Sequence, residues 1–331
     1  MKDGLVVVAG GGGFIGGHLV ARLREQGYTR IRSVDVKPLD DWYQRFDDVD
    51  SRQLDLRRID HCDQAVDGAS EVYNLAADMG GMGFIENNKA ACMLSVLINT
   101  HMLQSALGAG VERFFYASSA CVYAAGKQRD PNVTALREAD AYPAEPEDGY
   151  GWEKLFSERM CRHFTEDFGL DTRVARYHNV YGPFGTFDGG REKAPAAICR
   201  KVAEAEILDR PEIEIWGDGK QTRSFTYIDD CIFGTEAIMD SDLAEPVNLG
   251  SATLVTIDDL VSIVEEIAGV SLARRYKPDA PTGVRGRNSD NTKLKAALGG
   301  WEPSTALRDG LEVTYRWVRD EVRAQRALAV G

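Results

Sequence analysis

The apolar residues at the start of this chain form short continuous runs, each followed by glycine or by a polar side chain. The runs Leu5–Ala9 and Ile31–Val34 suit two strands, and the amphipathic segment from Phe14 to about Gln26 suits a helix between them. Continuous apolar strands are typical of a parallel sheet that helices cover on both faces. The pattern therefore predicts a strand, a helix and a second, parallel strand.

Strands and helices continue to alternate until about residue 178. One further strand is expected to end at 53–56, and three more are expected at Glu71–Ala77, Val111–Ala117 and Asp171–Tyr177. One helix is expected from about Lys89 to Leu107. Beyond residue 178 the expected strands are Glu212–Trp216 and Pro246–Leu249, and the expected helices lie near Thr256–Ile267, Asn291–Leu298 and Leu307–Ala327. We expect an α/β fold, a Rossmann-type doubly wound parallel sheet with a smaller C-terminal α/β lobe.

A glycine turn joins the first strand to the first helix. Gly10, Gly13 and Gly16 let the backbone turn tightly and approach a pyrophosphate at the helix N-terminus, beside Phe14 and Ile15. Asp35 ends the second strand about 20 residues after the turn, where a carboxylate suits the ribose hydroxyls of adenosine and repels a 2′-phosphate. The pattern favours NAD over NADP, although Asp35 alone would also suit a solvated loop.

Other polar positions lie where a dinucleotide would pass. Asp55, followed by Leu56, is placed to reach the adenine edge, and Ala76 ends the fourth strand. Asn99 interrupts an apolar helix, either as a satisfied buried amide or as a brace on the cofactor side.

Three reactive side chains follow the strand at 111–117. Ser118 and Ser119 end it, Cys121 comes two residues later, and carboxyl ends of parallel strands are where such sheets bind ligands. Tyr150 and Lys154, spaced i and i+4, share one face of a helix. Each feature alone has an ordinary structural explanation, but their combination with the glycine turn indicates an enzyme.

Composition narrows the class of protein. The 331 residues include 39 basic and 52 acidic ones, a net charge of −13 that argues against a general nucleic-acid binder. The six cysteines (62, 92, 121, 161, 199 and 231) are scattered without a Cys-x-x-Cys pair, so we expect neither disulfides nor a metal site, and a cytoplasmic location. We expect no signal peptide and no apolar stretch of membrane-spanning length.

These motifs resemble the extended short-chain dehydrogenase/reductase superfamily. More narrowly, the chain is similar over nearly its whole length to the GDP-mannose 3,5-epimerases, on the segments 74–85, 113–121, 189–197, 221–225 and 284–290. The resemblance implies NAD, a GDP-sugar substrate and a homodimer. Residues 1–178, with 223–250 returning to them, would form the NAD-binding domain, and 179–222 with 251–331 the nucleotide-sugar lobe.

The resemblance also implies a mechanism. Tyr150, helped by Lys154 and Ser119, would take the proton of the sugar 4-hydroxyl during oxidation at C4, and Cys121 as base and Lys193 as acid would act at C3 and C5. The substrate contacts it implies are Gly80, Ser119, Ala120, Cys121, Asn179, Glu192, Lys193, Lys201, Gln221, Arg223 and Arg287. Arg223 and Arg287 suit the diphosphate, with Arg285 as the alternative.

Several alternatives remain open at this point. Tyr123 is followed by Ala124-Ala125-Gly126 where plant members have a Pro-Glu pair, so a related GDP-hexose or GDP-heptose, or epimerisation at only one carbon, is an alternative. A 4,6-dehydratase would carry Asp-Glu in place of Ala120-Cys121, and a 4-epimerase would need neither Cys121 nor Lys193. A non-catalytic NAD-binding protein would need none of these groups together.

Overall fold

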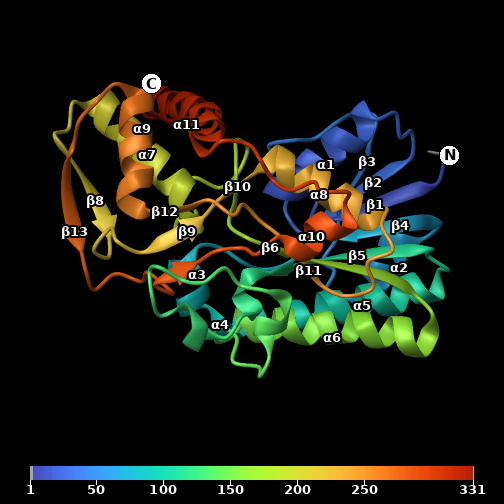
Figure 1. The fold of residues 1–331 in the computed structure, drawn as a ribbon. Helices are drawn as coiled ribbons and strands as arrows, with labels where there is room; N and C mark the ends of the chain where they lie inside the picture. The colour runs from blue at the N-terminus through green and yellow to red at the C-terminus, as the bar shows by residue number, and fades with distance from the viewer. Residues whose placement is uncertain (1–2, 331) are drawn as a thin grey trace.

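A computed structural model describes residues 3–330. Its centre is a sheet of seven parallel strands in the order β11-β6-β5-β4-β1-β2-β3 (Figure 1). These strands are β1 (Leu5–Ala9), β2 (Ile31–Asp35), β3 (Asp50–Gln53), β4 (Ala69–Asn74), β5 (Arg113–Ser119), β6 (Asp171–Tyr177) and β11 (Val247–Leu249). The doubly wound α/β fold is confirmed.

Helices cover both faces of the sheet, which explains the continuous apolar strands. In β1, Leu5 and Val7 join a core with α2 (Ile59–Val66), α5 (Ser95–Gly108) and α6 (Tyr150–Phe168). Val6 and Val8 join the opposite core with α1 (Phe14–Glu25) and α8 (Ile228–Met239). Successive side chains of a strand point to opposite faces, so every residue of β1 is buried.

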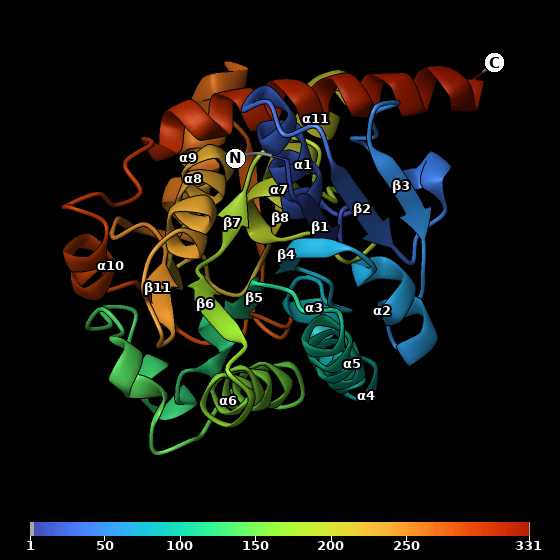
Figure 2. The same ribbon diagram turned by 90° about the vertical axis from the view of Figure 1, so that its right-hand side faces the viewer.

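A smaller lobe lies beside the carboxyl ends of the strands, at the left of Figure 1. Its helices are α7 (Ala194–Leu208), α9 (Ile257–Ala268) and α11 (Leu307–Val330), which pack on one another. Its strands are β8 (Glu212–Trp216), β9 (Thr222–Ser224), β12 (Leu254–Thr256), β13 (Ala273–Lys277) and β14 (Gly286–Arg287). Figure 2 shows α11 running along the edge of the molecule to the C-terminus.

The remaining elements connect these two parts. The short helix α3 (Met82–Asn87) and the strand pair β7 (Val180–Tyr181) and β10 (Thr226–Tyr227) lie between the lobe and the sheet. Helix α4 (Lys89–Met93) packs on α6, and α10 (Thr292–Ala297) packs beside the edge strand β11 (Figure 2). Strand β11 and helix α8 return the chain to the large sheet after β10. The loop before α7 and the loop after β4 thereby meet at the boundary, because the Gly81 N–H donates to the Arg191 carbonyl at 2.9 Å.

Two local predictions were wrong. The third strand ends at Gln53, not at 53–56, and Leu54 and Leu56 instead reach the core from a loop. The helix expected from Lys89 to Leu107 is divided into α4 and α5 at Leu94. Periodicity places apolar side chains correctly but does not distinguish a strand from a loop that buries the same residues.

The segment Lys89–Gly108 also contradicts the expectation that no stretch reaches spanning length. It is 20 residues long with a mean hydropathy of 1.3, enough to cross a membrane by length and composition alone. Core helices of soluble proteins pass the same test, and 44% of its most apolar window is buried inside the protein. Helix α5 packs against α2 and α6, which accounts for its apolar composition.

Candidate active site

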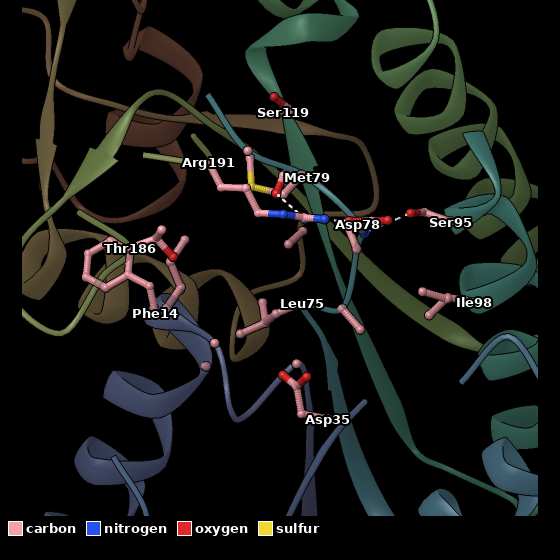
Figure 3. A pocket seen from close by; sticks show the side chains of 18 of the residues that line it. Phe14, Asp35, Leu75, Asp78, Met79, Ser95, Ile98, Ser119, Thr186 and Arg191 are labelled. Atoms are coloured by element: carbon pink, nitrogen blue, oxygen red, sulfur yellow. Dashed lines mark hydrogen bonds and ion pairs between the residues drawn. The ribbon is translucent and has the colours of Figure 1, made fainter. Parts of the chain in front are cut away.

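A cavity of about 600 Å³ lies over the carboxyl ends of the parallel strands. Figure 3 shows Asp35 at one end of it and Ser119 at the other, with Phe14 on one side and Ile98 on the other. Its wall contains these residues expected to hold the cofactor: Gly10, Gly13, Phe14, Ile15, Gly16, Asp35, Asp55, Leu56, Ala76, Tyr150 and Lys154. The cavity therefore collects nearly the whole expected set.

The glycine turn is required by backbone contacts. Gly10 has a φ of +83°, and a Cβ on Gly16 would lie 2.1 Å from the Gly10 carbonyl oxygen. Gly13 precedes the first residue of α1 with no side-chain cap, so the N–H groups of that helix end face the cavity side of the turn. A 12-residue helix beginning there offers donors and a positive dipole end to an anion.

Acidic groups mark the other end of this cavity. Asp35 is buried, and its Oδ1 accepts the Lys37 N–H at 3.0 Å, which orients the carboxylate. Asp55 pairs with Arg57 at 2.7 Å, and this hydrogen bond holds the pKa of Asp55 below its usual range. Lys37 and Arg57 also line the cavity, and the sequence analysis missed both because exposed basic residues carry no motif.

Asn99, also predicted at the cofactor site, does not line this cavity. It is buried, its Oδ1 accepts from Asn74 at 3.2 Å, and its Nδ2 donates to the Ser157 carbonyl at 3.4 Å. These bonds satisfy the buried amide and join α5 to β4 and α6.

Ser119, Tyr150 and Lys154 meet where β5 ends and α6 begins. Lys154 Nζ donates to the Ala117 carbonyl at 3.0 Å and lies 5.5 Å from the centroid of the Tyr150 ring. Burial raises the pKa of Tyr150 well above its usual value, the charge of Cys121 raises it further, and a hydrogen bond from Ser119 opposes this. The phenol therefore needs a cation beside it to act as a base near neutral pH.

A second cavity of about 380 Å³ opens between the sheet and the smaller lobe. It contains every residue expected to contact the substrate: Gly80, Ser119, Ala120, Cys121, Asn179, Glu192, Lys193, Lys201, Gln221, Arg223 and Arg287. Ser119, Tyr150 and Lys193 line both cavities. A ligand in the second cavity is thereby brought to the end of one in the first.

Cys121 and Lys193 both line the second cavity, and the charge of Cys121 affects the pKa of Lys193. Burial raises the pKa of the Cys121 thiol to about 11, Glu147 adds to this, and Arg287 opposes it. Burial also lowers the pKa of Lys193, although the charge of Cys121 opposes that shift. Both shifts favour the uncharged groups, as expected where water is scarce.

The two arginines expected at a diphosphate have different surroundings. The buried Arg223 donates to the carbonyls of Thr222, Thr282 and Val284, and within residues 3–330 it has no carboxylate partner. Burial and the nearby Arg287 charge lower its pKa to about 9. Such a guanidinium retains its charge most easily when an anion binds beside it.

Arg287 instead lies against the reactive thiol. Its Nη1 donates to Cys121 Sγ at 3.6 Å, its Nε to Gln128 Oε1 at 2.7 Å, and its Nη2 to Glu147 Oε1. Arg285, the alternative, pairs with Asp218 and lines neither cavity. A diphosphate role therefore stays a prediction for Arg223, and the contacts of Arg287 favour the thiol.

Other polar groups in the second cavity are oriented by the lobe. Asn179 donates to the Ser224 carbonyl at 3.0 Å, Lys201 to the Glu214 carbonyl at 2.8 Å, and Glu192 Oε2 accepts the Gly190 N–H at 2.7 Å. Gln221 Nε2 donates to the Trp216 carbonyl at 2.9 Å, while its buried Oε1 has no partner within the described residues. That oxygen is available to a ligand N–H group.

Sequence reasoning missed three residues of this region. Trp216 and Phe225 line the second cavity, and Glu147 lies against Arg287. The sequence contained a signal for Trp216, because the alternation of β8 places this large aromatic residue on the polar face of the strand together with Glu214. In the structure Trp216 is 43% exposed. Glu147 carried no such signal, since it lies in a Pro-rich loop among other carboxylates.

Comparisons with known proteins agree with this geometry. Residues 6–250 match the protein family described as "NAD dependent epimerase/dehydratase family". The chain is 47% identical over 326 residues to GDP-mannose 3,5-epimerase 1 of Oryza sativa subsp. japonica and 44% identical over 323 residues to GDP-mannose 3,5-epimerase of Arabidopsis thaliana. These matches cover 98% and 97% of this chain and 84% of each relative.

Solved structures share the fold. UDP-glucose 4-epimerase of Thermotoga maritima, solved with UDP-glucose, superposes with a TM-score of 0.85 at 26% identity and covers 96% of this chain and 99% of its own. MoeE5 in complex with UDP-glucuronic acid and NAD superposes with a TM-score of 0.80 at 28% identity, covering 96% and 100%.

Proposed function

This chain belongs to the NAD dependent epimerase/dehydratase family, and we propose that it epimerises GDP-α-D-mannose at C3 and C5 through a 4-keto sugar. The products would be GDP-L-galactose and, when only C5 is inverted, GDP-L-gulose. The observation that carries the proposal is the placement of Cys121 and Lys193 in one cavity that meets the NAD cavity at Ser119 and Tyr150.

The first cavity fits NAD. The close approach of Gly16 to Gly10 leaves no room for a side chain at the start of α1, where a pyrophosphate would bind. Asp35 is buried and oriented by Lys37, and it would hold the ribose hydroxyls. NAD bound there would accept the hydride that leaves C4 and would return this hydride to C4 at the end of the cycle. The enzyme therefore needs no net oxidant.

Proton transfer at the 4-hydroxyl falls to Tyr150. Its Oη takes the hydroxyl proton as the C4 carbonyl forms and gives it back on reduction, and Ser119 hydrogen-bonds the same oxygen. Lys154 stabilises the phenolate from one turn along α6, held in place by the Ala117 carbonyl at 3.0 Å. Burial excludes water from these groups, which strengthens their electrostatic interaction.

Proton transfer at carbon falls to Cys121 and Lys193. The C4 carbonyl acidifies the protons on C3 and C5. Cys121 as the thiolate removes one of them and becomes the thiol, and Lys193 as the ammonium delivers a proton from the opposite face and becomes the amine. The Cys121 sulfur lies in the turn after β5 and the Lys193 nitrogen at the start of α7, so they would approach the sugar from different elements. That arrangement supports inversion.

The nucleotide end of the substrate would lie in the smaller lobe. Arg223 offers a buried cation to the diphosphate, and the unpartnered Oε1 of Gln221 offers an acceptor to N–H groups of guanine. Trp216 lies on the wall of the same cavity, where an aromatic ring suits a base.

Incubation with GDP-α-D-mannose in D₂O, followed by NMR, tests the proposal. Deuterium at both C3 and C5, lost in Cys121→Ser and in Lys193→Ala, supports it. Exchange at one carbon only narrows the reaction, and exchange with a related GDP-hexose or GDP-heptose but not with mannose changes the substrate. No exchange with any GDP-sugar overturns the proposal.

We also propose that the enzyme works as a cytoplasmic homodimer. Large apolar side chains are exposed on three helices that pack together, a surface suited to a second copy. They are Met93 on α4, Leu94 between α4 and α5, Leu97 on α5, and Trp152 and Phe156 on α6. The six free, buried cysteines suit a reducing compartment. Sedimentation of the wild type and of Phe156→Glu tests the dimer, which the charge is expected to dissociate.

A further inference from the structure

A buried carboxylate lies beside Cys121 and has no part in the steps above. Glu147 accepts the Arg287 Nη2–H through Oε1, and its other oxygen, Oε2, is buried without a partner within residues 3–330. Its side chain is 10% exposed and that of Arg287 is 5% exposed. The backbone N–H of Glu147 donates to the Cys121 carbonyl at 3.0 Å. This hydrogen bond holds the backbone of Glu147 against the segment that carries the thiol.

The thiol thus has one anion and one cation as its closest charged neighbours. Arg287 Nη1 donates to Cys121 Sγ at 3.6 Å and favours the thiolate, whereas the charge of Glu147 favours the thiol. Because Glu147 also holds the guanidinium in place, one carboxylate affects the sulfur both directly and through Arg287. Ionised groups in a buried site act on one another far more strongly than they would in water.

Other titratable groups face the same sulfur and must be counted. They are Tyr150 on α6, Lys193 before α7, Arg223 on β9 and, in the same apolar cluster as Cys121 and Tyr150, Cys92 on α4. Glu147 is the carboxylate whose charge raises the pKa of the Cys121 thiol, second only to burial.

We propose that Glu147 is a positioning residue for Cys121: it holds Arg287 against the sulfur and governs the protonation state of the thiol. The role of Cys121 as a base rests on the proposed function, but the influence of Glu147 on the thiol does not. With the charge of Glu147 present, the thiol keeps its proton to a higher pH than it would beside Arg287 alone. The protonated thiol reacts more slowly than the thiolate with alkylating agents and oxidants.

Alkylation of Cys121 by iodoacetamide, measured against pH by peptide mass mapping on the NAD-loaded full chain, tests the proposal without any sugar. Cys121 lines a cavity and is 6% exposed, whereas the other five cysteines are 0% exposed, so the reagent should select it. Glu147→Gln keeps the shape and removes the charge. We expect its alkylation midpoint to fall by at least about one pH unit, raising the rate near neutral pH about tenfold.

Three further variants separate charge from structure. Arg287→Gln should move the midpoint upward, Glu147→Asp should leave it near that of the wild type, and Glu145→Gln, at an exposed position two residues away, should not change it. NAD binding by each variant confirms its fold. A midpoint in Glu147→Gln that is equal to or above the wild-type midpoint overturns the proposal.

Deuterium exchange from GDP-mannose gives the catalytic readout. In Glu147→Gln the pH at which exchange begins should fall together with the alkylation midpoint. If no variant and no wild type exchanges deuterium, the proposed substrate is wrong, while the alkylation result still decides the role of Glu147.

Discussion

The ammonium group of Lys154 lies 5.5 Å from the centroid of the Tyr150 ring, one turn further along α6. Tyr150 is the first residue of that helix and follows Gly149, whose φ is +78°. This turn brings the phenol to the junction of the two cavities, and the i, i+4 spacing places the cation behind it. Tyr150 can therefore contact a ligand in either cavity, with the Lys154 ammonium group behind its ring.

Replacing Tyr150 by phenylalanine should abolish oxidation at C4. Loss of a positioned proton acceptor costs about 10²- to 10⁴-fold in rate, and the ring would keep the fold. The measurement is the formation of enzyme-bound NADH on mixing with GDP-mannose. Tyr142→Phe, at a 48% exposed ring, is the matched control and should retain the wild-type rate. Equal rates in both variants would remove Tyr150 from the mechanism.

The proton removal by Tyr150 should also depend on pH in a defined direction. Since burial raises the pKa of Tyr150, the rate of NADH formation should increase with pH on the alkaline side. Lys154→Met removes the cation that favours the phenolate and should move this increase to still higher pH. Stopped-flow absorbance from pH 6 to 10 measures it, and identical profiles would exclude the role of Lys154.

Replacing Lys193 by methionine should lower the activity and raise the stability of the folded chain. Deuterium exchange should fall about 10²-fold or more, whereas the free energy of unfolding should rise by about 1 kcal/mol because a poorly solvated cation is removed. Lys220→Met, at an exposed position, should change neither. Urea unfolding and NMR exchange measure the two effects, and a variant that is both active and less stable would contradict the assignment.

The stability difference at Lys193 should depend on pH. The pKa of Lys193 is lowered in the folded chain, so the folded chain is destabilised relative to the methionine variant while both states are protonated. Wild-type stability should therefore recover as pH rises from the lowered folded pKa towards the ordinary lysine value of about 10.4. Unfolding curves at several pH values measure the gap between the two proteins.

Replacing Asp35 by alanine should relax the choice between NAD and NADP. The carboxylate repels a 2′-phosphate, and its removal should reduce the preference for NAD by about tenfold, which corresponds to about 1.4 kcal/mol. Calorimetric titration with each dinucleotide measures it. Asp40→Ala, whose side chain is 98% exposed, is the control. An unchanged preference would mean that Asp35 does not face the ribose.

The buried pair of Glu158 and Arg176 should dominate stability near the site. Its atoms lie 2.7 Å apart with both side chains 3% exposed, and Ser118 donates to the same carboxylate at 2.5 Å. Glu158→Ala leaves a buried guanidinium without its partner and should cost about 3–5 kcal/mol. Glu166→Ala removes the exposed pair with Arg162 and should cost at most about 0.5 kcal/mol. Urea unfolding of both variants compares them directly.

Local patterns were enough for the architecture and for much of the site. Gly16 is required by a contact with Gly10 only six residues away, and Lys154 reaches Tyr150 within a single helical turn. Apolar runs identified the sheet because both of its faces are buried. Such features depend on chain neighbours and on periodicity, both of which can be recognised in one sequence.

Contacts between distant segments could not be anticipated in the same way. Asn99 fitted two interpretations, and its bonds to Asn74 and Ser157 could be found only in the folded chain. Leu54 and Leu56 had the spacing of a strand but lie in a loop, because burial alone determines that spacing. The resemblance to a family supplied Cys121, Lys193 and Arg223, yet it did not indicate what surrounds them.

The arrangement of Cys121, Glu147 and Arg287 shows most clearly which features the sequence determines and which only the folded structure decides. The sequence alone identified a thiol after a strand and a basic turn near the end of the chain, and it gave no reason to connect either with a carboxylate at 147. Folding brings the three together at the boundary of the sheet and the lobe, where Arg287 contacts both other residues. The strength of charge interactions depends on separation and burial, and these are properties of the folded chain rather than of residue spacing.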